Sequence, residues 1–268
     1  MKLPPLYPIL DFSCFAAKGE PLAAKVTFAE QLLGAGATII QYRDKSSDPR
    51  TFLANARELR RVTLNKAAFI INDRTDLALA CDADGVHLGQ DDLSPAAARK
   101  IFDQMVSHPF SQSSGNAQLL PERMGHPTGL ESGEQWVPHP FAAKTNAPMK
   151  LSSERVGIDT AVTRGKLLIG FSTHNLSQVH EADSLPVDYI AIGPVFATGS
   201  KDNPDPVVGL DGVRAARAAT TKPLVAIGGI TRANAREVQA AGADSVAVIS
   251  DLLESPAKAV ADFLRVLG

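Results

Sequence analysis

The feature that most constrains this chain is a repeated alternation of short, β-branched apolar runs with longer stretches of helical character. Several runs are apolar throughout, which is typical of parallel strands that are buried on both faces. The runs that we predict to be strands are Tyr7–Phe12, Thr38–Tyr42, Ala68–Ile71, Gly85–Leu88, Leu167–Phe171, Tyr189–Ile192, Leu224–Ile227 and Ser245–Ile249.

The stretches between these runs carry helix signals. Pro21–Leu33 and Asp48–Asn65 are amphipathic, and Asp48 followed by Pro49 is typical of an N-cap and a first helical position. Eight strand–helix units predict an α/β protein with a closed (β/α)8 TIM barrel, as one domain over residues 1–268. An open doubly wound sheet is the alternative, but its glycine fingerprint is missing after the first strand.

Residues 106–165 interrupt the alternation. They contain six prolines and few apolar runs, so we predict an irregular, partly disordered insertion between helix four and strand five. Connections from a helix to the next strand lie at the bottom of a barrel, whereas active sites lie at the top. We therefore expect no metal site from the histidines of this stretch, which are His108, His126 and His139.

Composition narrows the functional classes. A formal net charge of −2 argues against bulk attraction to nucleic acid or to an anionic membrane. No run approaches the ~18 apolar residues of a membrane span, and the N-terminus has no signal-peptide core. Cys14 and Cys81 suggest no disulfide framework. We expect a cytoplasmic protein, and a homo-oligomer is left open.

The residues that follow the strands are the candidates for chemistry, because barrel enzymes place functional side chains there. Alternation puts Gln41, Arg43 and Lys45 on one side of the second strand, where an amide and two cations suit a diphosphate. A solvated charge run is the other interpretation. Asp73 and Asp92 follow the third and fourth strands, and such carboxylates are typical ligands of Mg²⁺.

The second half of the chain offers a different kind of site. Thr198, Ser200 and Lys201 form a loop that resembles a phosphate-binding loop, although an ordinary exposed loop remains the alternative. The pair Gly228-Gly229 follows strand seven, where backbone amides usually seat a phosphate. Ser172 and His174 lack a nucleophile elbow, so we interpret Ser172 as a hydroxyl that binds substrate or relays a proton, rather than as part of a triad.

Taken together, these motifs resemble the thiamine phosphate synthase family. The resemblance covers both ends of the chain outside the insertion. The motifs that carry it are Gln-Tyr-Arg-Asp-Lys at 41–45, Ile-Asn-Asp-Arg at 71–74, Gly-Val-His-Leu-Gly-Gln-Asp-Asp at 85–92, Gly-Phe-Ser-Thr-His at 170–174, Gly-Pro-Val-Phe-Ala-Thr-Gly-Ser-Lys at 193–201 and Ile-Gly-Gly-Ile at 227–230.

The resemblance implies a Mg²⁺-dependent transferase. It would join an aminopyrimidine diphosphate to a thiazole phosphate, or to its carboxylate, and release pyrophosphate. Asp73 and Asp92 would hold Mg²⁺. The residues implied to bind the two phosphorylated substrates are Gln41, Arg43, Lys45, Asn72, Ser172, Thr198, Ser200, Lys201, Gly228, Ile249 and Ser250. Arg43, Ser172 and Lys201 would act closest to the reacting centre.

Two other functions fit the same barrel. A thiazole tautomerase resembles this family but lacks its full diphosphate and metal set, which Asp92 and Lys201 complete here. A non-catalytic phosphate-binding paralogue would keep the seat at Gly228 and lose the metal acids.

Overall fold

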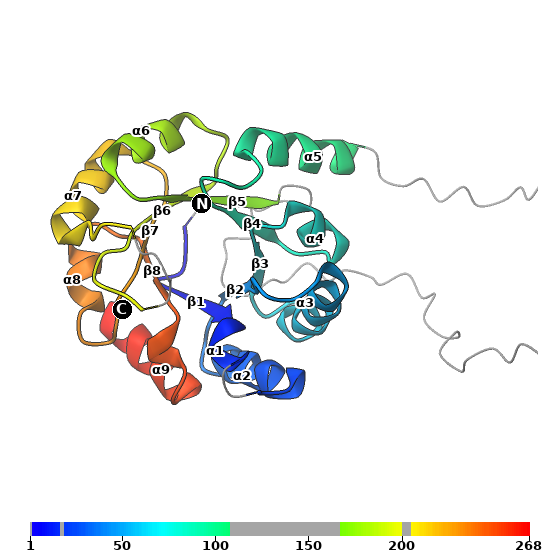
Figure 1. The fold of residues 1–268 in the computed structure, drawn as a ribbon. Coiled ribbons are helices and arrows are strands. Elements are labelled where there is room, and N and C mark those ends of the chain that lie inside the picture. The colour runs from blue at the N-terminus through cyan, green and yellow to red at the C-terminus, as the bar shows by residue number, and fades with distance from the viewer. Residues whose placement is uncertain (1, 17–18, 108–166, 200–204) are drawn as a thin grey trace, which may run out of the picture. The chain divides into compact units, whose positions relative to one another are not determined.

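Eight parallel strands close into a barrel in the computed structural model, which describes residues 2–16, 19–107, 167–199 and 205–268 (Figure 1). Each strand pairs with the next along the chain, and β1 pairs with β8 to complete the ring. The strands are β1 (Leu6–Asp11), β2 (Ile39–Arg43), β3 (Ala68–Asn72), β4 (Gly85–Leu88), β5 (Leu168–Thr173), β6 (Tyr189–Ile192), β7 (Leu224–Ile227) and β8 (Ser245–Val248).

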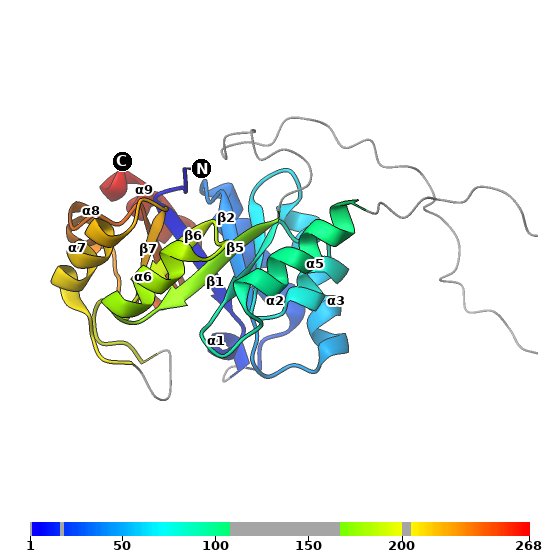
Figure 2. The ribbon, with the colours of Figure 1, turned by 90° about the horizontal axis from the view of Figure 1, so that it is seen from above.

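Helices surround this barrel in Figure 1, and Figure 2 shows them lying along its outside. The helices are α1 (Ser13–Ala16), α2 (Leu22–Gly34), α3 (Pro49–Thr63), α4 (Thr75–Ala80), α5 (Pro95–Ser107), α6 (Leu176–Ser184), α7 (Gly209–Ala219), α8 (Ala235–Ala240), α9 (Pro256–Leu267) and the 3₁₀ turn η1 (Ser250–Leu252). The capping prediction is confirmed at α3, where the Asp48 carboxylate accepts hydrogen bonds from the backbone N–H groups of Arg50 and Thr51.

Strand alternation divides the apolar residues into two cores. In β2, Ile39 packs inside the barrel, while Ile40 and Tyr42 pack between the barrel and its helices. The same alternation turns Gln41 and Arg43 toward a cavity at the carboxyl ends of the strands. Hydrophobic burial on both faces of each strand therefore fixes which side chains reach the cavity.

The fold class predicted from the sequence is confirmed, with shifts at element ends. β5 runs to Thr173, so Ser172 lies on the strand rather than after it. The predicted start of the insertion at residue 106 was wrong, because Val106 and Ser107 still belong to α5. The rest of that segment, including its three histidines, lies outside the described residues and stays a prediction. No helix among the described residues is long and apolar enough to cross a membrane.

Candidate active site

A cavity opens at the carboxyl ends of the strands. Eight of the residues proposed from the sequence line it: Gln41, Arg43, Asn72, Ser172, Thr198, Gly228, Ile249 and Ser250. They come from six of the eight strands or the loops that follow them, and closure of the barrel is what brings them together. Lys45, Asp73 and Asp92 do not line the cavity. Ser200 and Lys201 lie outside the described residues.

Arg43 is held by an acid that sequence reasoning missed. Its guanidinium forms an ion pair with Asp11, whose side chain is 1% exposed at the end of β1. The Asp11 carboxylate also accepts hydrogen bonds from the Ser13 backbone N–H at 3.0 Å and from the Ser13 hydroxyl at 2.7 Å. A buried carboxylate with these donors fixes the direction of the Arg43 cation at the cavity.

The two predicted metal acids lie side by side. The Asp73 carboxylate forms an ion pair with Lys45, and the Asp92 carboxylate accepts a hydrogen bond from the Gly89 backbone N–H at 2.7 Å. Burial raises the pKa of Asp92, and the adjacent carboxylate of Asp73 raises this pKa further. Two carboxylates that repel each other at a strand end favour a cation between them.

The backbone at Asp73 is unusual as well. Its φ is +63°, in the left-handed region that few residues other than glycine adopt. Its backbone N–H donates to the carbonyl of His87 at 2.8 Å, which ties the turn to β4. Backbone strain of this kind is found at functional sites, where the surrounding structure keeps it in place.

This pair of carboxylates fits Mg²⁺. No group of three or more His, Cys, Asp or Glu side chains that could hold a metal occurs among the described residues. Mg²⁺ is commonly bound by one or two carboxylates, with substrate phosphates and water as the remaining ligands. Asp73 and Asp92 match the carboxylate part of that donor set, and Lys45 forms an ion pair with Asp73 beside them.

Ser172 belongs to a chain of hydrogen bonds that crosses the barrel interior. The Ser172 hydroxyl lies 2.8 Å from Nε2 of His87, and Nδ1 of His87 lies 3.1 Å from the Tyr189 hydroxyl. The Tyr189 hydroxyl lies 2.7 Å from that of Tyr7, which accepts a hydrogen bond from Gln41 Nε2 at 3.2 Å. Sequence reasoning named the two ends of this chain and missed its three central members.

A glycine in β5 makes room for this chain. A Cβ atom on Gly170 would lie 2.1 Å from Cζ of Tyr189 and 2.3 Å from its hydroxyl oxygen. Real atoms cannot approach so closely, so only glycine at this position lets the Tyr189 ring cross the strand. The Tyr189 ring is then stacked on that of His87, with centroids 5.6 Å apart.

The opposite side of the cavity is built from backbone. Gly228 has φ +104°, and a Cβ there would lie 2.5 Å from Cβ of Pro194. The carbonyl of Gly228 accepts a hydrogen bond from the Phe196 backbone N–H at 3.0 Å, so the loops after β6 and β7 are packed against each other. The two loops therefore approach so closely at Gly228 that a side chain would not fit, while the role of this glycine as a phosphate seat stays a prediction.

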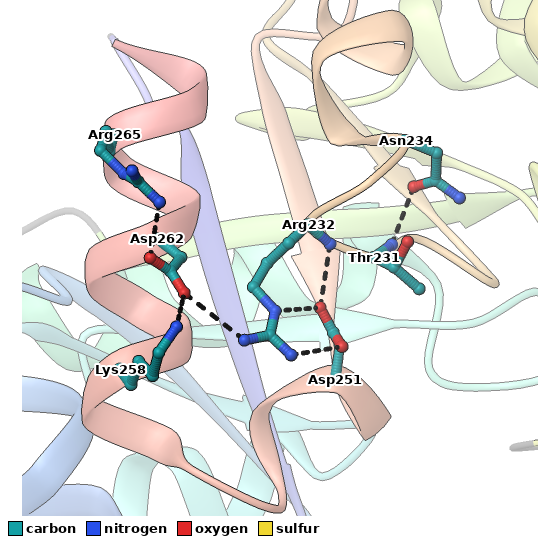
Figure 3. Close-up of polar contacts among 7 residues, drawn as sticks. All are labelled: Thr231, Arg232, Asn234, Asp251, Lys258, Asp262 and Arg265. Carbon is teal, nitrogen blue, oxygen red and sulfur yellow. Dashed lines mark hydrogen bonds and ion pairs between the residues drawn. The ribbon is translucent and has the colours of Figure 1, made fainter.

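Side chains behind the cavity hold this backbone in place. The Asp251 carboxylate accepts hydrogen bonds from the Arg232 backbone N–H at 2.9 Å and from its guanidinium at 3.0 and 3.2 Å (Figure 3). Asn234 accepts from the Thr231 backbone N–H at 2.8 Å and donates to the Gly229 carbonyl at 3.0 Å. We call Arg232, Asn234 and Asp251 the clamp.

The clamp joins the loop after β7 to the one after β8, because Asp251 directly follows Ser250. On its outer side, Asp262 of α9 lies 3.5 Å from Arg232 and also pairs with Lys258 and Arg265 (Figure 3). The clamp residues were not predicted from the sequence. Their only sequence signal is polar residues shortly after a strand end, which many loops share.

Comparisons with known protein sequences identify one family. The family model described as thiamine monophosphate synthase matches residues 13–108 and 151–252. A thiamine-phosphate synthase from Koribacter versatilis is 42% identical over 268 residues, which is 100% of this chain and 97% of the relative. A thiamine-phosphate synthase from Chloroflexus aurantiacus is 35% identical over 82% of this chain and 74% of the relative.

Comparisons with solved structures find the same family and the same fold. The thiamine phosphate pyrophosphorylase from Pyrococcus furiosus superposes with a TM-score of 0.66 and 28% identity, covering 98% of this chain and 95% of that one. A 3-hexulose-6-phosphate synthase has a TM-score of 0.56 and 13% identity, with 100% of both chains covered, and so shares the fold alone.

Proposed function

The chain belongs to the thiamine monophosphate synthase family, and on that premise we propose that it makes thiamine phosphate. It would join 4-amino-2-methyl-5-hydroxymethylpyrimidine diphosphate to thiazole phosphate and release pyrophosphate, or join it to the carboxylated thiazole phosphate and release both pyrophosphate and the carboxylate as CO2. One observation carries the proposal beyond family membership. A single barrel mouth holds both a carboxylate pair with a lysine and a glycine-lined backbone seat, as two phosphorylated substrates require.

In the proposed reaction, the bond between the pyrimidine methylene carbon and the diphosphate oxygen breaks first. Its electron pair leaves with the diphosphate, and the resulting pyrimidinylmethyl cation is captured by the lone pair of the thiazole nitrogen. Little covalent help from the protein is needed, because the pyrimidine amine stabilises the cation. The protein's part is to hold both partners in contact and to stabilise the leaving charge.

We propose that Asp73 and Asp92 hold Mg²⁺, which neutralises charge on the leaving diphosphate when it is bound. Arg43, held by Asp11, and Lys45 would bind the same diphosphate, with Asn72 and Gln41 on the pyrimidine. The site roles of Lys201 and Ser200 stay predictions, since both residues lie outside the described ranges.

On the other side of the mouth, Thr198 and Ser200 would bind the thiazole, and Lys201 would bind the pyrophosphate. The backbone of Gly228, Ile249 and Ser250 would seat the thiazole phosphate. Backbone amides suit this task because they bind an anion without a counter-charge that must be neutralised when the site is empty.

We also propose a cytoplasmic location, since Cys14 and Cys81 are free thiols. A homo-oligomer stays a prediction.

The test is to mix the purified protein with both substrates and Mg²⁺ and to detect thiamine phosphate as its fluorescent oxidation product. We expect product that disappears when a chelator is added and returns with excess Mg²⁺. Absence of product from a folded sample would refute the proposal. A thiazole isomerisation assay on that sample would then separate the tautomerase from the non-catalytic paralogue.

A further inference from the structure

The hydrogen bonds inside the barrel form a chain in which each group donates to the next. This donor-to-acceptor order determines which atom each end of the chain offers to a ligand. We call Gln41, Tyr7, Tyr189, His87 and Ser172 the relay. Gln41, Tyr7, His87 and Ser172 line the cavity, and each of the three central residues is at most 8% exposed. The relay therefore runs along the cavity wall from Gln41 to Ser172, by way of the fully buried Tyr189.

The direction begins at Gln41. Its Nε2 donates to the Tyr7 oxygen, so the Tyr7 hydroxyl proton must find its acceptor elsewhere. Among the described residues, the Tyr7 hydroxyl has only one other partner, the Tyr189 oxygen at 2.7 Å. A reversed bond, from Tyr189 to Tyr7, would leave the buried Tyr7 proton without an acceptor among the described residues, which is unfavourable.

The same reasoning assigns the donors and acceptors from Tyr189 to Ser172. Since the Tyr189 oxygen accepts from Tyr7, its own proton points to Nδ1 of His87. Nδ1 then accepts, so a neutral His87 carries its proton on Nε2 and donates it to the Ser172 oxygen. The Ser172 hydroxyl proton is left to point into the cavity.

Electrostatics keep both phenols protonated for this task. Burial raises the pKa of Tyr7 to about 12, and burial together with the neighbouring Tyr7 raises the pKa of Tyr189 above its usual range. Both groups therefore keep their protons at neutral pH, as a directional chain of hydroxyls requires. Such chains are cooperative, because each bond polarises the next.

We propose that the relay fixes Ser172 as a hydrogen-bond donor to the substrate, and that Tyr7, Tyr189 and His87 are positioning residues that act through it. Resting on the proposed function, the acceptor of this hydrogen bond is an oxygen of the leaving diphosphate. The other end is complementary: with Nε2 committed to Tyr7, Gln41 offers its Oε1, an acceptor, to a ligand N–H. The relay thus selects a ligand with a donor at one end and an oxygen acceptor at the other.

The coupling is tested by a double-mutant cycle on the full chain. Tyr189→Phe removes one hydroxyl and keeps the ring, and we expect kcat to fall about tenfold while the substrate KM values change less than about twofold. In a Ser172→Ala background, the same substitution should change kcat by less than about twofold, because Tyr189 acts through Ser172. Equal effects of Tyr189→Phe in both backgrounds would overturn the proposal.

A matched control comes from the third tyrosine of the chain. The Tyr42 hydroxyl donates to Asp44 at 3.1 Å outside the barrel interior and does not belong to the relay. Tyr42→Phe should leave kcat unchanged, and thermal melting of all variants shows whether each one is folded. A loss of kcat in Tyr42→Phe equal to that in Tyr189→Phe would indicate a general packing effect and contradict the proposal.

The direction is tested without any activity. In the ¹⁵N-histidine-labelled wild-type protein, the His87 resonances are identified by their loss in His87→Gln. We expect the neutral tautomer with the proton on Nε2, and a proton on Nδ1 would overturn the assigned direction. If the wild-type protein makes no thiamine phosphate, the proposed function fails, while this spectrum still decides the direction of the relay.

Discussion

The two sides of the cavity mouth are built on different principles. The side at β2–β4 consists of charged side chains: Lys45 pairs with Asp73, Asp73 lies against Asp92, and Arg43 pairs with Asp11. The side at β7–β8 presents backbone, shaped by Gly228 and held from behind by the clamp. Charged side chains must be compensated when no ligand is present, whereas backbone amides must only be held in position.

This difference predicts how each side fails. A changed charge on the first side should affect the chemical step, because that side would stabilise the leaving charge in the transition state. A loosened backbone on the second side should mainly weaken binding of one substrate. The two sides are therefore separable by kinetics.

The largest effect is expected from Asp92→Ala. Removal of this carboxylate should lower kcat by about a thousandfold or more, because the proposed Mg²⁺, which would neutralise the leaving group, would lose a ligand. The melting temperature should stay close to that of the wild type. The matched control is Asp76→Ala, since Asp76 pairs with Arg74 on the surface of α4. An Asp92→Ala protein with normal turnover would remove the metal assignment.

Gly228→Ala should have the next largest effect. The new Cβ would meet Pro194 at 2.5 Å with the backbone at φ +104°, so we expect a loss of about 1–3 kcal/mol in unfolding free energy. The KM for the thiazole phosphate should rise more than that for the diphosphate. Gly34→Ala is the control, because a Cβ there meets nothing within 4 Å. Equal rises in both KM values would contradict the assignment of one substrate to each side of the cavity mouth.

A smaller effect is expected from Asp251→Ala, which opens the clamp without touching the cavity wall. The KM for the thiazole phosphate should rise by about three- to tenfold at nearly constant kcat, because the loops after β7 and β8 lose their common anchor. Asp262→Ala serves as the control, since it leaves the bonds between Asp251 and Arg232 in place. A similar KM rise in both variants would show that the clamp has no special role.

The smallest effect is expected from deletion of residues 108–163 with a short linker. The chain leaves α5 at Ser107 and enters β5 at Leu168, where the strand begins and the mouth is farthest away. Neither side of the mouth should change, so kcat and both KM values should stay within about twofold. A folded deletion protein without activity would show that this segment contributes to the reaction.

Local pattern in the sequence was sufficient for the fold and for the outline of the site. Apolar runs indicated the strands, and the strand ends then indicated Gln41, Arg43, Asn72 and Gly228, all of which line the cavity. Asp73 and Asp92 were found in the same way and lie together. This was possible because a parallel barrel places every strand end on one side, so position along the strand is enough.

Contacts across the barrel needed the tertiary structure. Tyr7 and Tyr189 look like ordinary strand residues, and they are 182 positions apart in the chain, yet their hydroxyls lie 2.7 Å from each other. His87 and Ser172 are 85 positions apart, and Asp11 reaches Arg43 over 32. Alternation shows that a side chain points inward, but only closure of the barrel and the space left by Gly170 decide which inward groups meet.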